Sequence, residues 1–217
     1  MDMLKTDAQI LLQILNIQDK DKLILIKEDT DSDGNFIIAH ALRHIFQDEN
    51  RGVCLVMLQN NLIHYQSVGK RLNYNLQENI TTKRDRKSTA GFVNKVFGLI
   101  YVIIDNLSCL LDIGWEFKHC MHFVNMLINL NDRVNVIVSV HQATSDDQHL
   151  ATAMNYISDI VVSVESLKAG RSPIVTGIIN IKRNDTSVEN YHFKTSEKGL
   201  RYLNRVILLR IYMLFNI

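Results

Sequence analysis

The chain has 217 residues, which favours one domain or one domain with a small appendage. Hydrophobic residues make up 47% of it, a proportion typical of a globular protein with a sizeable core and not of a disordered chain. The formal net charge of +1 gives no overall attraction to nucleic acid or membranes, so any charge-driven binding must come from local patches.

Helices and strands are predicted to alternate along most of the chain. The first helix follows a capping box at Thr6 to Gln9, and Leu11 and Leu15 lie on one of its faces. Short apolar runs rich in β-branched residues predict buried strands. We expect strands at 22–27, 53–58, 99–104, 134–140, 159–164 and 175–181, helices at 38–45, 63–72, 115–130 and 146–158, and a closing hairpin of 191–194 with 200–203. This order predicts an α/β fold with a mainly parallel sheet and an antiparallel edge.

A polar and charged segment without periodicity, residues 73–88, is predicted to be an exposed loop. It contains a basic run that could contact nucleic-acid phosphates, formed by Lys83, Arg84, Arg86 and Lys87. A solvated loop explains the same residues equally well, so both interpretations stay open here.

The first strand, turn and helix have the order of a phosphate-binding loop. That chemistry requires the pattern G-x-x-x-x-G-K-[ST], in which backbone N–H groups surround the phosphates, the lysine neutralises charge and the hydroxyl holds magnesium. The corresponding positions here run from Asp29 to Phe36, and only Gly34 matches. Asn35 stands at the lysine position and Phe36 at the hydroxyl position, while Asp29, Asp31 and Asp33 would repel a triphosphate. We therefore predict a degenerate loop that binds no nucleotide cofactor in the usual way.

The same acidic residues match the first half of a calcium-binding EF-hand loop. His40 occupies the twelfth position, where a bidentate glutamate is required, and a strand instead of a helix precedes the loop. We therefore favour an Asx-rich turn that caps the following helix over a metal site.

A second landmark is the apolar run Tyr101 to Ile104, which ends in Asp105 and has the shape of a Walker B motif. Asn106 follows, so no second carboxylate is adjacent to activate water. His141 and Gln142 end the next strand, where ATPases of this kind place a polar phosphate sensor, although a hydrogen-bonded strand-end histidine is equally compatible. His119 and His122 share a helical face but have no evident partner ligands, so we expect no metal there.

Several of these motifs together resemble the Elongator complex protein 6 family over roughly residues 23–202. The most specific segments are His64, Tyr65, Val68 and Gly69, and Asp105, Asn106, Leu107 and Ser108; the others are Asp31 to Phe36, 136–141 and 160–170. The resemblance implies a RecA-like fold, in one domain over residues 1–203. Residues 73–95 form a more compressed loop region than the family pattern has, and the apolar tail at 204–217 has no assigned role.

The resemblance also implies a function. The protein would be a non-catalytic member of a heterohexameric ring with Elongator proteins 4 and 5, which docks on the catalytic Elongator subunits, binds tRNA and supports modification of the wobble uridine. The alternative is a divergent RecA-family ATPase with an atypical nucleotide site. The three cysteines lack the spacing of a disulfide framework, and the start of the chain lacks a signal-peptide pattern. We expect a cytoplasmic protein without a membrane partner, and the nucleus remains open as a second compartment.

Overall fold

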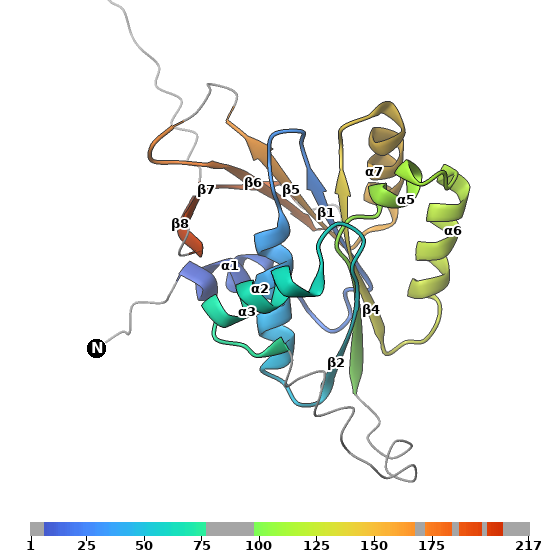
Figure 1. Ribbon diagram of the computed structural model, residues 1–217, viewed down its shortest axis with the longest axis horizontal. Coiled ribbons are helices and arrows are strands. Elements are labelled where there is room, and N and C mark those ends of the chain that lie inside the picture. The colour runs from blue at the N-terminus through green and yellow to red at the C-terminus, as the bar shows by residue number, and fades with distance from the viewer. Residues whose placement is uncertain (1–6, 77–97, 168–171, 184–186, 197–198, 206–217) are drawn as a thin grey trace, which may run out of the picture.

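The computed structural model describes residues 7–76, 98–167, 172–183, 187–196 and 199–205. In this part of the chain, one eight-stranded sheet has the order β2-β3-β4-β1-β5-β6-β7-β8 (Figure 1). Its strands are β1 Leu23–Glu28, β2 Arg51–Val56, β3 Leu99–Ile104, β4 Val134–His141, β5 Ile160–Ser166, β6 Gly177–Arg183, β7 Glu189–Ser196 and β8 Gly199–Arg205. The helices are α1 Asp7–Leu15, α2 Asn35–Phe46, α3 Leu62–Arg71, α5 Ser108–Asp112, α6 Phe117–Ile128 and α7 Ser145–Ile157.

The sheet has a parallel part and an antiparallel part. Strands β2, β3, β4, β1 and β5 pair in parallel, and β6, β7 and β8 continue the sheet with antiparallel pairings. This confirms the predicted mainly parallel α/β fold with an antiparallel edge and a closing hairpin. Because β1 lies between β4 and β5, the turn after β1 emerges between the carboxyl ends of those two neighbours.

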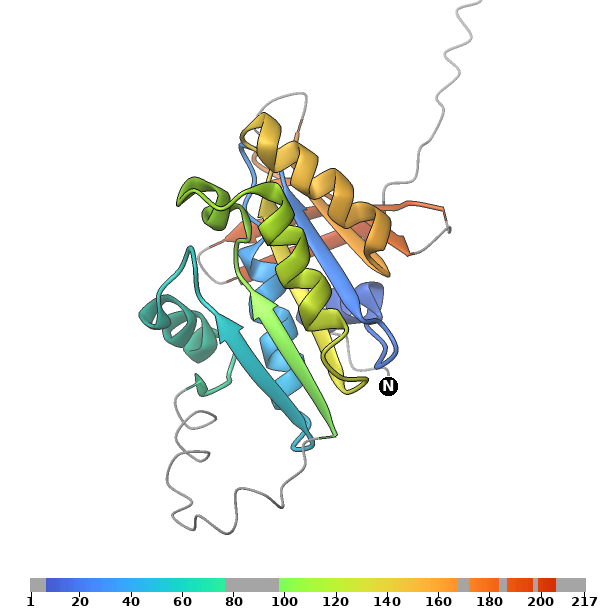
Figure 2. The same cartoon turned by 90° about the vertical axis from the view of Figure 1, so that its right-hand side faces the viewer.

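Helices cover the sheet on both sides (Figures 1 and 2). Side chains of β1 alternate between two apolar cores: Ile24 and Ile26 pack with α1 and α2, while Leu23 and Leu25 pack with residues of α6 and α7. All four are at most 2% exposed. Burial on this scale stabilises a fold by about 1.5–3 kcal/mol per large aliphatic side chain, which holds the end of β1 in a fixed position.

One strand differs from the sequence prediction. Residues 53–58 were expected to form a buried strand, but β2 spans Arg51–Val56 at the edge of the sheet, with Cys54 exposed. Its residues are mostly intermediate in burial because β2 has a single neighbouring strand, β3. An apolar run of this length does not distinguish an edge strand from a central one.

The compressed region between α3 and β3 does not interrupt the sheet. Strand β2 pairs directly with β3 in parallel register, from Arg51 opposite Leu99 to Val56 opposite Ile104. Residues 77–97 lie outside the described part of the chain, and so does the predicted basic run Lys83, Arg84, Arg86 and Lys87. The apolar tail is likewise outside it from residue 206 onward. Among the described residues, no helix is both long and apolar enough to cross a bilayer.

Candidate functional site

The degenerate loop follows β1 and is tied to the end of β5. The Asp29 carboxylate accepts hydrogen bonds from the Ser166 N–H at 2.8 Å and from the Ser166 hydroxyl at 3.0 Å. The Ser32 hydroxyl donates to the Val164 carbonyl at 2.7 Å. Burial opposes ionisation of Asp29, but the hydrogen bonds from Ser166, Ser32 and Asp31 outweigh it and lower the pKa of its carboxyl group. The loop is therefore closed onto the sheet by its own side chains.

Three backbone N–H groups of the loop already have carboxylate acceptors within the protein. The Asp31 N–H donates to the Asp29 carboxylate at 3.1 Å, and the Asn35 N–H donates to the Asp33 carboxylate at 2.8 Å. The Gly34 N–H is hydrogen-bonded to Glu28. In a phosphate-binding loop these amides surround the phosphates. Here three carboxylates take up three of the donors that a phosphate would need.

The prediction that this turn caps the next helix is correct only in part. The cap residue of α2 is Gly34, which has no side chain to accept a hydrogen bond. Asp33 instead binds the N–H of Asn35, the first helical residue. Asp31 and Asp33 remain exposed, so negative charge is kept near the positive end of α2.

Glu28 is the central residue of the site, and its role could not be recognised from the sequence. It is 2% exposed, and its Oε1 accepts a hydrogen bond from the Ser139 hydroxyl of β4 at 2.8 Å. Burial raises the pKa of Glu28 to about 7, despite the hydrogen bond from Ser139, and the nearby Asp33 and Asp105 act in the same direction. In the sequence Glu28 only follows the apolar strand predicted at 22–27. Nothing there indicates that its carboxyl group is buried beneath the loop.

Asp105, the Walker B-like aspartate, is fully buried and performs a structural task. Its Oδ1 accepts from the N–H groups of Leu58 at 2.6 Å and Gln59 at 3.0 Å, and its Oδ2 accepts from the Asn60 N–H at 2.8 Å and the Tyr65 hydroxyl at 3.2 Å. Burial, together with the Asp105 charge, raises the pKa of Tyr65 well above its usual range. The aspartate thus fastens the turn after β2 to α3.

The residue at the lysine position takes part in the same network. The Asn60 amide donates to the Asn35 side-chain oxygen at 3.2 Å, and this joins the start of α2 to the turn held by Asp105. Asn35 is 9% exposed. Its short amide thus serves as a link between two segments of the protein.

The sensor-like residues lie next to Glu28. His141 Nδ1 is 3.8 Å from Glu28 Oε2, and the Gln142 N–H donates to the Glu28 carbonyl at 2.8 Å. The Ser108 hydroxyl donates to the His141 carbonyl at 3.0 Å and accepts from the His141 N–H at 3.2 Å. The structure therefore brings His141 and Gln142 to the end of β1, where they contact Glu28.

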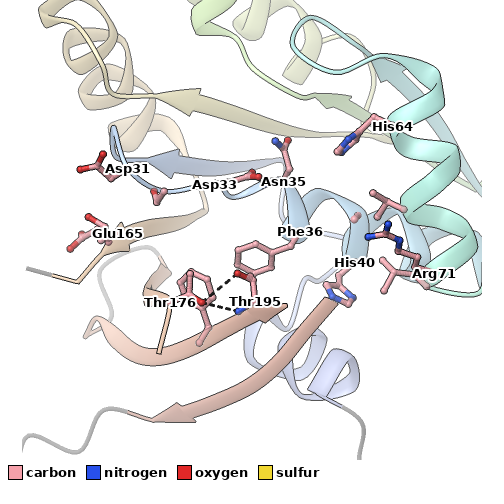
Figure 3. Close-up of a pocket in the computed structure, with 16 residues that line it drawn as sticks. Asp31, Asp33, Asn35, Phe36, His40, His64, Arg71, Glu165, Thr176 and Thr195 are labelled. Carbon is pink, nitrogen blue, oxygen red and sulfur yellow. Dashed lines mark hydrogen bonds between the residues drawn. The ribbon is translucent and has the colours of Figure 1, made fainter. Parts of the chain in front are cut away.

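A pocket of about 360 Å³ opens beside the loop (Figure 3). Its apolar centre contains Phe36, whose ring centroid is 5.1 Å from that of Phe193 on β7. Asp31, Asp33 and Glu165 line it on one side, and His40, His64 and Arg71 line it on the other. Asp105, His141 and Gln142 do not contribute to it. Residues of the degenerate loop therefore line the pocket, whereas the Walker B-like and sensor-like residues do not.

His40 is the second residue whose role sequence reasoning missed. It lies on α2 and is 2% exposed, and its Nδ1 has no hydrogen-bond partner within the described structure. Burial, assisted by the charge of Arg43, lowers its pKa to about 4, so the ring is neutral at physiological pH. In the sequence it appeared only as the residue that fails the calcium pattern. The described residues contain no group of three or more histidine, cysteine or acidic side chains placed to hold a metal ion.

The fold is similar to that of several archaeal proteins of known structure. Flagellar accessory protein FlaH from Methanocaldococcus jannaschii aligns with 92% of this chain and 97% of its own, at 12% identity and a TM-score of 0.62. An uncharacterized Pyrococcus horikoshii protein in complex with an unknown peptide aligns with 93% of this chain and 99% of its own, at 12% identity and a TM-score of 0.61. A KaiC-like protein from Pyrococcus horikoshii OT3 aligns with 84% and 89%, at 12% identity and a TM-score of 0.53.

At this level of identity the likeness concerns the fold alone, and it confirms the predicted RecA-like class. The model of the Elongator subunit Iki1 family matches residues 10–208, and the chain therefore belongs to that family. The match confirms the Elongator resemblance that the motifs indicated. No curated protein matches the chain.

Proposed function

We propose that this chain is a non-catalytic, RecA-like subunit of Elongator, of the protein 6 type. In this proposal it assembles with Elongator proteins 4 and 5 into a heterohexameric ring that docks on the catalytic subunits. The ring binds tRNA and supports modification of the wobble uridine. Family membership supports the Elongator part, and the motifs around His64 and Asp105 support the choice of subunit. We propose the cytoplasm as its compartment and leave the nucleus as a second.

The observation that carries the non-catalytic part is that carboxylates accept three of the loop amides. Asp29, Asp33 and Glu28 accept the N–H groups of Asp31, Asn35 and Gly34. A phosphate would have to displace them and then lie next to negative charges. Two like unit charges about 4 Å apart repel each other by about 4 kcal/mol near a protein surface. The lysine and hydroxyl that offset this cost in a phosphate-binding loop are replaced by Asn35 and Phe36.

Exposed apolar side chains support a role in assembly. Ile113 is 73% exposed, Trp115 41% and Phe117 43%, and all three lie at the α5–α6 connection. Trp115 packs edge-on against Phe123, which keeps its ring at the surface. Aromatic residues gathered on a surface are typical of protein interfaces.

Co-expression with Elongator proteins 4 and 5 tests the assembly. We expect the three proteins to co-purify as one particle of ring size, and recovery of this chain as a stable monomer in their presence would contradict the proposal. A titration of the purified chain with MgATP tests the alternative, because tight nucleotide binding by the isolated chain would favour a divergent ATPase.

The contribution to tRNA binding is tested within the assembled ring. Replacing Lys83, Arg84, Arg86 and Lys87 by glutamine would weaken tRNA binding and lower its salt dependence if these side chains contact phosphates, because fewer phosphate contacts release fewer counterions on binding. Unchanged affinity would assign the run to a solvated loop and leave the rest of the proposal standing.

A further inference from the structure

The pocket beside the loop has features that the proposed function does not use. Its centre is aromatic, formed by the packed rings of Phe36 and Phe193. Its volume, about 360 Å³, lies at the lower end of the range of ligand pockets. It is built by segments far apart in sequence: the loop and α2, α3, the end of β5, the residue before β6, and β7. Such a pocket accommodates one or two large side chains.

The charges around the pocket are separated. Asp31, Asp33 and Glu165 lie on one side of Phe36, and His40, His64 and Arg71 on the other (Figure 3). No lysine, arginine or histidine within the described residues lies within 4.0 Å of the three carboxylates. The carboxylates of Asp33 and Glu165 each accept a hydrogen bond from an uncharged group, the Asn35 N–H and the Asn180 amide. The charge of Lys27 on β1 acts on Glu165 from beyond that distance, so the acidic side retains acceptors for a further cation.

A second and independent feature points to an occupant. His40 lines the pocket and is 2% exposed, yet its Nδ1 has no hydrogen-bond partner in the described structure. A buried polar atom without a partner is rare and costs stability, so its presence in a pocket wall indicates a missing partner group. The Nδ1 atom is covered by its neighbours, so a segment bound in the pocket supplies its partner only when the side chains around His40 move.

We propose that this pocket binds an arginine-bearing segment of a partner protein. The guanidinium group lies against the Phe36 ring and donates to the Asp31, Asp33 and Glu165 carboxylates, while the buried Phe193 ring supports Phe36 from behind. Arginine suits this environment better than lysine, because its planar, weakly hydrated cation stacks on aromatic rings and forms paired hydrogen bonds to carboxylates. The acidic loop, which cannot bind a triphosphate, then serves as the acceptor for a cation.

Calorimetric titration of the full-length chain with blocked tripeptides tests the proposal. The probes are acetyl-Phe-Arg-Phe-amide and the same peptide with lysine or glutamate in the middle. We expect the arginine peptide to bind at least about tenfold more tightly than the glutamate peptide and about threefold more tightly than the lysine peptide. Equal affinity for the arginine and glutamate peptides, or no binding of the arginine peptide up to millimolar concentration, would overturn it.

Two variants locate the binding. Asp31→Asn combined with Glu165→Gln is expected to weaken the arginine peptide about tenfold, whereas a control with the same charge change elsewhere, Asp112→Asn with Glu49→Gln, changes it less than about twofold. Asp31→Lys alters one exposed residue and is expected to abolish binding, which keeps the test valid if the double variant folds poorly. Full binding by Asp31→Lys would exclude this pocket. The titration uses the chain alone, so its result is independent of the assembly experiment.

Discussion

Glu28 on β1 and Ser139 on β4 are joined across the centre of the sheet by a hydrogen bond of 2.8 Å between the Glu28 Oε1 and the Ser139 Oγ. Both residues are at most 2% exposed. The bond lies directly under the degenerate loop, because Glu28 also accepts the Gly34 N–H. A buried carboxyl group thus connects the central strands to the loop, and its ionisation has a predictable effect on stability.

Replacing Glu28 by glutamine should change how stability depends on pH. The pKa of Glu28 is about 7 in the folded protein and near 4.5 in the unfolded chain, so the folded state keeps a proton that the unfolded state loses. Glu28 therefore makes the free energy of unfolding decrease between about pH 4.5 and pH 7, by about 3 kcal/mol in total. In the Glu28→Gln variant this decrease should be absent. Urea unfolding at several pH values measures it.

The exposed Glu49 provides the control for this experiment. Glu49→Gln removes one carboxylate without touching the buried site, so its unfolding midpoints should follow those of the original protein at every pH. If Glu28→Gln followed them as well, the carboxyl group of Glu28 would not be the one whose pKa is raised.

His40 should have the opposite effect on the pH profile. Its pKa is about 4 in the folded protein, below the ordinary 6.5, so the unfolded chain binds a proton that the folded state rejects. This makes the free energy of unfolding fall by about 3 kcal/mol as the pH decreases from about 6.5 to about 4. Between pH 4.5 and 6.5 the contributions of His40 and Glu28 therefore oppose each other.

The two single substitutions should therefore change the pH dependence of the free energy of unfolding in opposite directions. Relative to the original protein, Glu28→Gln should gain stability toward pH 7, and His40→Gln should gain stability toward pH 4. The double variant should differ little from the original protein in slope between pH 4.5 and 6.5. If both single substitutions changed this pH dependence in the same direction, at least one of the two pKa shifts would have the opposite sign to that stated here.

The sequence was sufficient for most of the fold, because short apolar runs separated by helical patterns predict a parallel α/β sheet. It did not distinguish the edge position of β2, since the run containing Cys54 is as apolar as a central strand. The short helix α5 was also missed, because the five residues Ser108–Asp112 are too few to show a helical period.

The hydrogen-bond partners that hold the candidate site could not be predicted from the sequence. The spacing located the loop and Asp105, yet Ser166, which binds the Asp29 carboxylate, lies 137 residues away, and the partners of Asp105 lie 40–47 residues away, so neither set has a local signature. Nothing in the sequence marks Glu28, which follows the strand predicted at 22–27, as a residue of the site. The pocket depends on Phe36 meeting Phe193, a contact that only the folded sheet creates.

Restoring the lysine of the phosphate-binding loop should not restore nucleotide binding. In the Asn35→Lys variant the amides of Asp31, Gly34 and Asn35 still have carboxylate acceptors, so a triphosphate gains one cation but few free donors. We expect millimolar MgATP to shift the unfolding temperature by less than about 1 °C, because weak binding stabilises little. Binding gained by this single change would show that the missing lysine was the main obstacle.

Replacing Asp105 by asparagine should destabilise the protein without any nucleotide being involved. Three backbone N–H groups and the Tyr65 hydroxyl donate to the Asp105 carboxylate, and an amide group in its place would point N–H donors at other donors. Unpaired buried donors and a lost charge-assisted network cost about 2–4 kcal/mol of the free energy of unfolding. Tyr65→Phe, which removes one of the four donors, should cost about 1 kcal/mol.

The exposed Asp112→Asn variant should remain within about 0.5 kcal/mol of the original protein. If Asp105→Asn were as stable as that control, the aspartate would not be the structural anchor of the turn after β2, and a role resembling that of a Walker B carboxylate would have to be reconsidered.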